Sequence, residues 1–290
     1  MDLLAALRDT GDVVLGILDH PASTGGEVTP FLKWAGGKRW LMPMGTRLGR
    51  QGVRRYFEPF LGSGAMFFSI RPAYAFLSDA NEELVETYEA LKEDWEAVRS
   101  CLLRHNSRHD EHYYYKVRSA KPRTRVTRAA RFIYLNRTCW NGLYRVNRNG
   151  EFNTPIGSKT SAILSTDDFE AISSALVNAS ITCSDFEVQI DQAGEGDLIF
   201  ADPPYTVRHQ YNGFVKYNEK LFSWDDQVRL CDVLLRAKGR GALVICTNAD
   251  HKSIRELYGP KFHIESLSRF SSIAGKGGVR GSYAEVAIIG

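Results

Sequence analysis

Residues 197–205 read DLIFADPPY, and this stretch decides the fold. Leu198–Ala201 is a short apolar run, which predicts a strand buried on both faces. The prolines at 203 and 204 end this strand, because proline has no backbone N–H to donate to a neighbouring strand. A carboxylate, Asp202, and an aromatic ring, Tyr205, therefore stand at the carboxyl end of a buried strand.

Strand and helix patterns alternate on both sides of this stretch. We expect strands at 53–58, 74–78, 180–184, 197–201 and 242–247, an antiparallel pair at 262–267 and 283–289 joined by a glycine-rich loop at 271–282, and helices at 65–70, 82–103 and 225–238. The alternation predicts an α/β fold with a mainly parallel sheet and helices on both faces. Ligands are then expected at the carboxyl ends of the strands.

The segment 104–148 interrupts this alternation and is strongly basic. It holds twelve Lys and Arg against two acids, a formal charge of +10, although the whole chain carries only +3. A solvated charged face is one explanation. Interleaved aromatic residues favour a nucleic-acid surface instead, because a basic field attracts phosphates and aromatic rings stack on bases. These aromatic residues are Tyr113, Tyr114, Tyr115, Phe132, Tyr134, Trp140 and Tyr144.

The sequence divides into three parts. Residues 104–165 form an inserted helical and loop subdomain, and residues 31–103 and 166–290 form the domain that it interrupts. Residues 1–30 are an N-terminal extension, in which we expect a short amphipathic helix at 1–18 and a turn-rich linker at 19–29.

Several protein classes are disfavoured. The chain has no apolar run long enough to span a membrane, and its first residues lack the basic start of a secretory signal, so we expect a cytoplasmic protein. The five cysteines form no CxxC pair and have no nearby His, which argues against disulfides or a zinc site. We expect no metal.

Three further motifs suit a small ligand. In FEPFLGSG, residues 57–64, a strand ends in a turn with two glycines, where a backbone approaches a ligand closely. Asp79 follows the next strand, and a carboxylate there suits the hydroxyls of a ribose. In FLKWAGGK, residues 31–38, a lysine suits a ligand carboxylate. Each motif alone also fits an ordinary turn or helix start.

The DPPY motif suits an exocyclic amine of a nucleobase. Asp202 and the carbonyl of Pro203 provide two acceptors for the two amine hydrogens, and Tyr205 offers a face on which a base can stack. Such acceptors favour a localised nitrogen lone pair that can attack a methyl donor.

The motifs in their order resemble the Dam-type DNA adenine-N6 methyltransferases (D12 class, alpha group). The resemblance rests on KWAGGK, FEPFLGSGAMFF, SDAN, the basic insert and ADPPY, and covers residues 31–289. It implies a Rossmann-like methyltransferase sheet with an inserted DNA-recognition subdomain, S-adenosylmethionine as methyl donor, and catalysis by Asp202, Pro203, Pro204 and Tyr205. The implied donor contacts are Trp34, Ala35, Gly36, Lys38, Glu58, Pro59, Phe60, Gly62, Ser63, Gly64, Asp79, Asp185, Phe186 and Asp202.

The insert also resembles the DNA-reading segment of this family, through NRTCWNGLYR at 136–145 and NTPIG at 153–157. The implied DNA contacts are Lys33, Arg137, Trp140, Asn141, Leu143, Arg145, Asn147 and Pro155. Trp140 would wedge into the duplex. Arg145 suits guanine O6 and N7, and Pro155 suits a thymine methyl, so the pattern is most consistent with GATC. A phosphate contact is the alternative for Arg145.

The resemblance implies an enzyme that flips an adenine out of double-stranded DNA and methylates its N6. A cognate restriction endonuclease is a possible partner, and no membrane is involved. Two alternatives stay open: methylation of cytosine N4 or of adenine in RNA, and a catalytically inactive DNA-binding accessory protein of the same fold.

Overall fold

The computed structural model describes residues 28–49, 53–147, 149–207, 222–269 and 283–290. The expected helix at 1–18, most of the linker at 19–29 and the glycine-rich loop at 271–282 lie outside the described residues. The chain forms two compact units. Of the described residues, the first unit comprises 53–60, 185–207, 222–269 and 283–290, and the second comprises 28–49, 61–147 and 149–184. No helix in the described ranges has the length and apolar character needed to cross a membrane.

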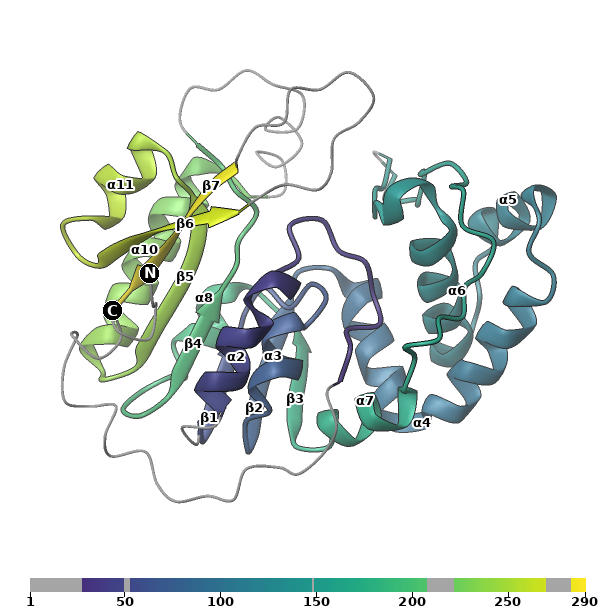
Figure 1. The fold of residues 1–290 in the computed structure, drawn as a ribbon, viewed down its shortest axis with the longest axis horizontal. Helices are drawn as coiled ribbons and strands as arrows, with labels where there is room; N and C mark the ends of the chain where they lie inside the picture. Colours follow the sequence, from purple (N-terminus) through teal and green to yellow (C-terminus); the bar gives the residue numbers. More distant parts are fainter. Residues whose placement is uncertain (1–27, 50–52, 148, 208–221, 270–282) are drawn as a thin grey trace. The chain divides into compact units, whose positions relative to one another are not determined.

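The first unit is built on five strands in the order β1, β4, β5, β7, β6 (Figure 1). These are β1 (Arg55–Glu58), β4 (Leu198–Ala201), β5 (Leu243–Ala249), β7 (Tyr283–Ile289) and β6 (His263–Arg269). β1, β4 and β5 are parallel, whereas β7 runs antiparallel to both β5 and β6. Every residue of β4 is buried, as its apolar run predicts.

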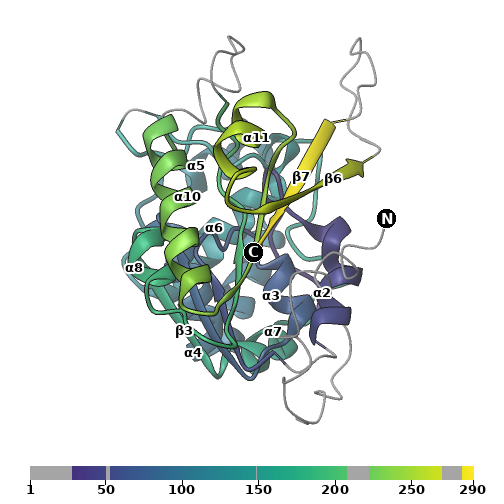
Figure 2. The ribbon, with the colours of Figure 1, turned by 90° about the vertical axis from the view of Figure 1, so that its left-hand side faces the viewer.

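Helix α10 (Trp224–Gly239) packs on β5 and contacts α8 (Phe186–Ile190) and α11 (Lys252–Tyr258) (Figure 2). Its start is fixed by a capping box: the Ser223 side chain accepts from the Asp226 backbone, and the Asp226 carboxylate accepts from the Ser223 backbone. This arrangement satisfies two backbone N–H groups that a helix start otherwise leaves unpaired.

The second unit holds the parallel pair β2 (Tyr74–Asp79) and β3 (Ala179–Cys183). Two short helices, α2 (Met42–Gly49) and α3 (Ala65–Ile70), pack together. The remaining helices are α4 (Glu82–Asn106), α5 (Glu111–Ser119), α6 (Arg125–Thr138) and α7 (Phe169–Leu176), with short 3-10 turns η2 (Arg39–Leu41) and η3 (Trp140–Gly142).

The α/β prediction is confirmed, and the mainly parallel strands are consistent with a Rossmann-like methyltransferase fold. The predicted strand and helix bounds agree with the structure to within three residues. The long helix predicted at 82–103 differs in one respect: α4 is kinked at Asp94, whose backbone leaves the helical region. The Asp94 carboxylate accepts from the Ala97 backbone N–H and so caps the second half of the helix.

A row of ion pairs joins α4 to α6, which run side by side (Figure 1). The basic partners come from the positively charged segment, and the acids come from outside it. The pairs are Arg125 with Glu93, Arg128 with Glu86, and Arg131 with Glu83. Part of the charge counted in the basic segment is therefore compensated within the second unit.

His105 of α4 lies in a partly buried cluster of aromatic rings with Tyr113 of α5 and Tyr134 of α6. Its ring stacks on Tyr134, with centroids 5.1 Å apart, and its Nδ1 lies 3.0 Å from the Tyr113 hydroxyl. Burial, together with the charges of Arg104, Arg108 and Arg131, lowers the pKa of His105 to about 4.

We expect this histidine to make the free energy of unfolding depend on pH. The unfolded chain takes up a proton below pH about 6.5, whereas the folded chain does so only near pH 4. Stability is therefore lost as the pH falls from about 6.5 toward 4, because the unfolded chain binds a proton that the folded chain excludes. His105→Phe should lessen this dependence. Denaturant unfolding at pH 7 and pH 5 measures it, with the exposed His112→Phe as control. Equal pH dependence in both variants would contradict the prediction.

Candidate active site and DNA-binding residues

In the first unit, Asp202 follows β4 directly, and the end of β5 lies beside it. The parallel register pairs Ala201 with Cys246 and so brings the next residues, Asp202 and Thr247, together. The Thr247 hydroxyl donates to Asp202 Oδ1 at 2.6 Å. This hydrogen bond fixes the orientation of the Asp202 carboxylate. Because the side chain is only partly buried, its oxygens can accept a hydrogen bond from a ligand at the strand end.

Tyr205 is held from a different strand. Its hydroxyl donates to Glu285 Oε2 at 2.9 Å, and Glu285 is a buried residue of β7. Burial, and then the charges of Asp202 and Glu285, raise the pKa of Tyr205 well above its usual range. The phenol therefore stays protonated and remains a hydrogen-bond donor. The ring is fixed at its far end, as a stacking platform requires.

Glu58 stands at the end of β1 and is also buried. The Tyr56 hydroxyl donates to Glu58 Oε2 at 2.8 Å. Burial, and then the nearby Glu58 charge, raise the pKa of Tyr56 well above its usual range. The Glu58 side chain thus accepts a hydrogen bond from a phenol that stays protonated. Pro59 next to it is buried.

Three phenylalanines pack around one another: Phe60 follows β1, Phe186 begins α8 and Phe222 precedes α10. The ring centroids of Phe60 and Phe186 lie 5.6 Å apart, and those of Phe60 and Phe222 also lie 5.6 Å apart. Phe186 and Phe222 are separated by 5.7 Å. The Phe60 and Phe186 rings are stacked at 29°, whereas Phe222 meets Phe60 edge-on at 83°.

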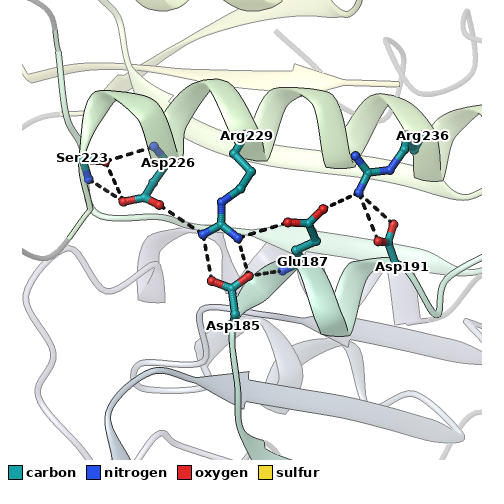
Figure 3. Close-up of polar contacts among 7 residues, drawn as sticks. All are labelled: Asp185, Glu187, Asp191, Ser223, Asp226, Arg229 and Arg236. Carbon is teal, nitrogen blue, oxygen red and sulfur yellow. Dashed lines mark hydrogen bonds and ion pairs between the residues drawn. The ribbon is translucent and has the colours of Figure 1, made fainter.

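Arg229 of α10 binds Asp185 with both ends of its guanidinium (Figure 3). Its guanidinium carbon lies 4.1 Å from the centre of the Phe186 ring. The hydrogen bonds from Arg229 hold the pKa of Asp185 below its usual value, against the opposing effect of burial. Asp185 also caps α8 by accepting from the Glu187 N–H. It is thus a firmly placed carboxylate.

The same face of α10 makes further ion pairs along α8 (Figure 3). Arg229 also bonds Glu187 of α8, and Arg236 bonds Glu187 and the α8 C-cap residue Asp191. Within α10, Arg229 bonds Asp226 as well. Two arginines therefore join α8 to α10 and hold the Asp185-Phe186 pair at the start of α8.

In the second unit, the glycine turn and Asp79 form one structure. Asp79 Oδ2 accepts from the Gly62 backbone N–H at 3.1 Å, and its Oδ1 accepts from Asn81 N–H at 3.0 Å. Burial raises the pKa of Asp79, while these hydrogen bonds oppose the rise. Gly62 and Gly64 have left-handed backbones, with φ of +48° and +64°. Ser63 between them is buried.

Trp34 lies against this turn. A β-carbon added at Gly62 would come within 2.7 Å of Trp34 Cδ1, so only glycine fits there. Trp34 also stacks on Tyr144, with ring centroids 5.7 Å apart. The Gly37 N–H donates to the Trp34 carbonyl at 3.1 Å and closes a turn around Ala35, and the buried Lys38 donates from Nζ to the Gly36 carbonyl at 2.7 Å.

The residues expected to read DNA gather around η3. Trp140 has 55 % of its surface exposed, which is unusual for tryptophan and suits a wedge. Its backbone N–H donates to the Pro155 carbonyl at 2.9 Å, so Trp140 and the exposed Pro155 share one surface. Asn141 is exposed with φ of +55°, and Leu143 is half-buried.

Two further residues of this group lie in the turn that follows. The Arg145 side chain is exposed, and its Nε donates to Asn153 Oδ1 at 2.7 Å, which extends the guanidinium in one direction. Asn147 uses its side chain within the turn: Nδ2 donates to Glu151, and Oδ1 accepts from Asn149 and Glu151 N–H groups.

Arg137 has a different place from the one expected. It is buried, it forms a two-point ion pair with Asp167, and it donates to the carbonyls of Phe31 and Ala162. All five N–H groups of a guanidinium are needed for such a set. Arg137 therefore has a structural role in the second unit, and we do not propose it as a DNA contact.

The sequence is similar to proteins of one family over most of its length. Residues 34–273 match the family model described as D12 class N6 adenine-specific DNA methyltransferase. The chain belongs to this family. The resemblance inferred from the motifs is thereby confirmed, and this D12-class protein is an adenine-specific DNA methyltransferase.

Its relatives come from several organisms. A type II methyltransferase, M1.LlaDCHI of Lactococcus lactis subsp. cremoris, is 35% identical over 89% of this chain and 94% of its own. A DNA N-6-adenine-methyltransferase of Escherichia phage P1 is 37% identical over 87% of this chain and 34% of its own. A DNA adenine methylase of Escherichia coli (strain K12) is 29% identical over 86% of this chain and 91% of its own.

Some of the expected site residues of the D12-class chain are in contact: Gly62 with Trp34 and Asp79, Phe60 with Phe186, and Trp140 with Pro155. Sequence reasoning missed Thr247, Glu285, Phe222 and Asn136, which hold or extend these groups. Two of them had a signal: Thr247 is a polar residue ending a buried strand, and Glu285 is an acid inside an apolar strand. In the described ranges, no group of three His, Cys, Asp or Glu side chains is arranged to hold a metal.

We expect Gly62→Ala to destabilise the protein. The left-handed backbone costs about 1–2 kcal/mol for alanine, and the contact with Trp34 adds about 1–3 kcal/mol of overpacking. Gly196→Ala is the matched control, because Gly196 has φ of +75° but no described atom within 4 Å of an added β-carbon. Denaturant unfolding compares the two. An equal loss of stability in both variants would show that Trp34 readily moves aside.

Proposed function

We propose that the D12-class protein transfers the methyl group of S-adenosylmethionine to N6 of an adenine flipped out of double-stranded DNA, in GATC or a related short site. The observation that carries the proposal is the orientation of the DPPY motif: Thr247 fixes the Asp202 carboxylate, and Glu285 fixes the Tyr205 phenol. Both groups are placed from buried strands before any substrate arrives, as positioning catalysis requires.

The residues of each unit suit S-adenosylmethionine. In the second unit, Gly62 has no room for a β-carbon and Asp79 is a carboxylate at a strand end, which fits close backbone contact and ribose hydroxyls. In the first unit, Phe60 and Phe186 suit an adenine ring, and Asp185 suits its amine. When bound, the donor supplies an electrophilic methyl group on sulfur. Trp34, Lys38 and Glu58 complete the proposed contacts.

The chain's part in the reaction is to hold and polarise the acceptor amine. Asp202, whose Oδ1 already accepts from Thr247, and the carbonyl of Pro203 accept the two hydrogens of adenine N6. Two acceptors outside the ring plane favour a localised lone pair on nitrogen. Tyr205 stacks on the base, and Pro204 stiffens the turn between them. The released proton passes to Asp202 or to water.

Recognition of DNA is assigned to the surface around η3. The exposed Trp140 fills the gap left by the flipped base. Arg145, Asn141, Leu143, Pro155 and Lys33 approach base edges in the major groove. Two relatives are named type II methyltransferases, and this supports a cognate restriction endonuclease as the proposed biological partner.

Asp202→Asn should abolish most methylation while leaving the fold intact. Asparagine keeps the size of the side chain and can still accept from Thr247, but it then directs N–H groups at the amine. Loss of one preorganised polar contact of this kind lowers turnover about 10²-fold or more. Methyl transfer from labelled S-adenosylmethionine to unmethylated DNA, followed by mapping of modified bases, measures the effect.

The control for this variant is Asp250→Asn, which alters a carboxylate paired with Arg255 on the protein surface. It should retain normal turnover. Substantial turnover by Asp202→Asn would contradict the assigned role. If cytosine is the modified base, or if only RNA is modified, the acceptor is not adenine in DNA. If the protein binds DNA but transfers no methyl group, the result favours an accessory role.

Arg145→Ala should relax base preference at one position of the site by about 1–3 kcal/mol, because Arg145 is exposed and oriented by Asn153. Methylation of duplexes with single base changes measures this preference. An equal loss of affinity for all sequences would identify Arg145 as a phosphate contact instead.

A further inference from the structure

Asn136 lies in the last turn of α6 and is 1 % exposed. Its side-chain amide pairs with the backbone of Lys33, a residue 103 positions earlier: Oδ1 accepts from Lys33 N–H at 2.9 Å, and Nδ2 donates to the Lys33 carbonyl at 2.8 Å. The amide thus binds Lys33 on both sides, as a neighbouring strand would. Nδ2 also donates to the Gly142 carbonyl at 3.3 Å.

These three hydrogen bonds join Lys33 to the turn that carries Trp140. Gly142 closes that turn with φ of +65°, and a β-carbon added there would lie 2.5 Å from Lys33 Cδ. The alkyl stem of Lys33 therefore lies across Gly142. Its exposed amine is directed by the same turn that presents Trp140.

The next residue connects this group to the glycine turn. Trp34 contacts Gly62 on one side and stacks on Tyr144 of the insert on the other. A shift of the Lys33 backbone would therefore move Trp34 as well. Asn136 is the buried polar group that sets where residues 33 and 34 lie relative to the insert.

We propose that Asn136 is a positioning residue for base recognition: it sets the place of Lys33 relative to the Trp140 turn and thereby sets discrimination at the base pair that Lys33 reads. This inference rests on the proposed function. Asn136 itself contacts no DNA, because it is buried. These three hydrogen bonds require an amide side chain at position 136, because they need one acceptor and two donors from one short side chain.

Asn106 provides a matched control within the second unit. Its Oδ1 accepts from Ser161 Oγ and from the N–H groups of Ala162 and Ile163, so it too makes three hydrogen bonds to a distant loop. It has no bond to Lys33 or to the Trp140 turn. Loss of Asn106 tests what an ordinary loop anchor contributes.

The experiment compares the unaltered protein with Asn136→Ala, Lys33→Ala, the double variant and Asn106→Ala. Each full-length protein methylates a pool of randomised DNA duplexes, and sequencing gives the ratio of modification at the preferred site to modification at each single-base neighbour. Asn136→Ala should lower this ratio about tenfold or more at one base pair, the size of one lost base contact. Lys33→Ala should lower it at the same base pair.

The modification ratio of the double variant should be no lower than that of either single variant, because both single changes remove the same base contact. Amide hydrogen exchange should rise at Lys33 and at residues 140–143 in Asn136→Ala, while Asn106→Ala should leave these amides and the ratio unchanged. If Asn136→Ala does not fold, Asn136→Asp replaces it, since it keeps the acceptor and the size but lacks both donors.

Three outcomes would overturn the inference. The first is an active Asn136→Ala variant whose modification ratio is unchanged. The second is a loss of activity that is equal at all sites. The third is a double variant in which the losses of discrimination from the two single variants add. If the unaltered protein modifies no DNA, the proposed function fails first, and this result is seen before any variant is compared.

Discussion

The parallel pairing of β4 with β5 is the constraint on which the catalytic residues depend. Both strands are buried, and their register places Asp202 beside Thr247. Slippage by one residue would turn Thr247 to the opposite face of the sheet and remove the donor. The antiparallel strand β7 adds the second restraint, because its register with β5 pairs Ala249 with Glu285, the partner of the Tyr205 hydroxyl. Two strands distant in sequence thus orient one four-residue motif.

The sequence predicts most of this, for identifiable reasons. Apolar runs bounded by glycine and proline locate the strands, and their order along the chain predicts parallel pairing. The rest depends on partners remote in sequence. Nothing near Arg137 shows that Asp167 neutralises it, and nothing near Asn136 shows that it pairs with Lys33. Polar side chains that bind backbone over such separations carry no periodic pattern, so they become visible only in three dimensions.

In the second unit, one short segment serves two groups of residues. Residues 31–38 lie against the glycine turn through Trp34, and against the insert through Phe31 and Lys33. Asn136 and Arg137, adjacent on α6, hold this segment by its backbone. The segment proposed to contact the methyl donor is therefore anchored by α6, which belongs to the part of the chain proposed to read DNA. A shift in either the donor-contacting or the DNA-reading residues would be passed to the other through these backbone contacts.

The ion pairs between α4 and α6 also bear on how the protein responds to salt. DNA binding releases the cations condensed on the duplex, and the logarithm of affinity falls with the logarithm of salt concentration by about 0.9 for each phosphate neutralised. Arg125, Arg128, Arg131 and Arg137 already face carboxylates inside the second unit. An arginine that is already paired with a carboxylate neutralises little phosphate charge, so it releases few cations from the duplex. The affinity for DNA should therefore fall less steeply with rising salt than a count of twelve basic residues would predict.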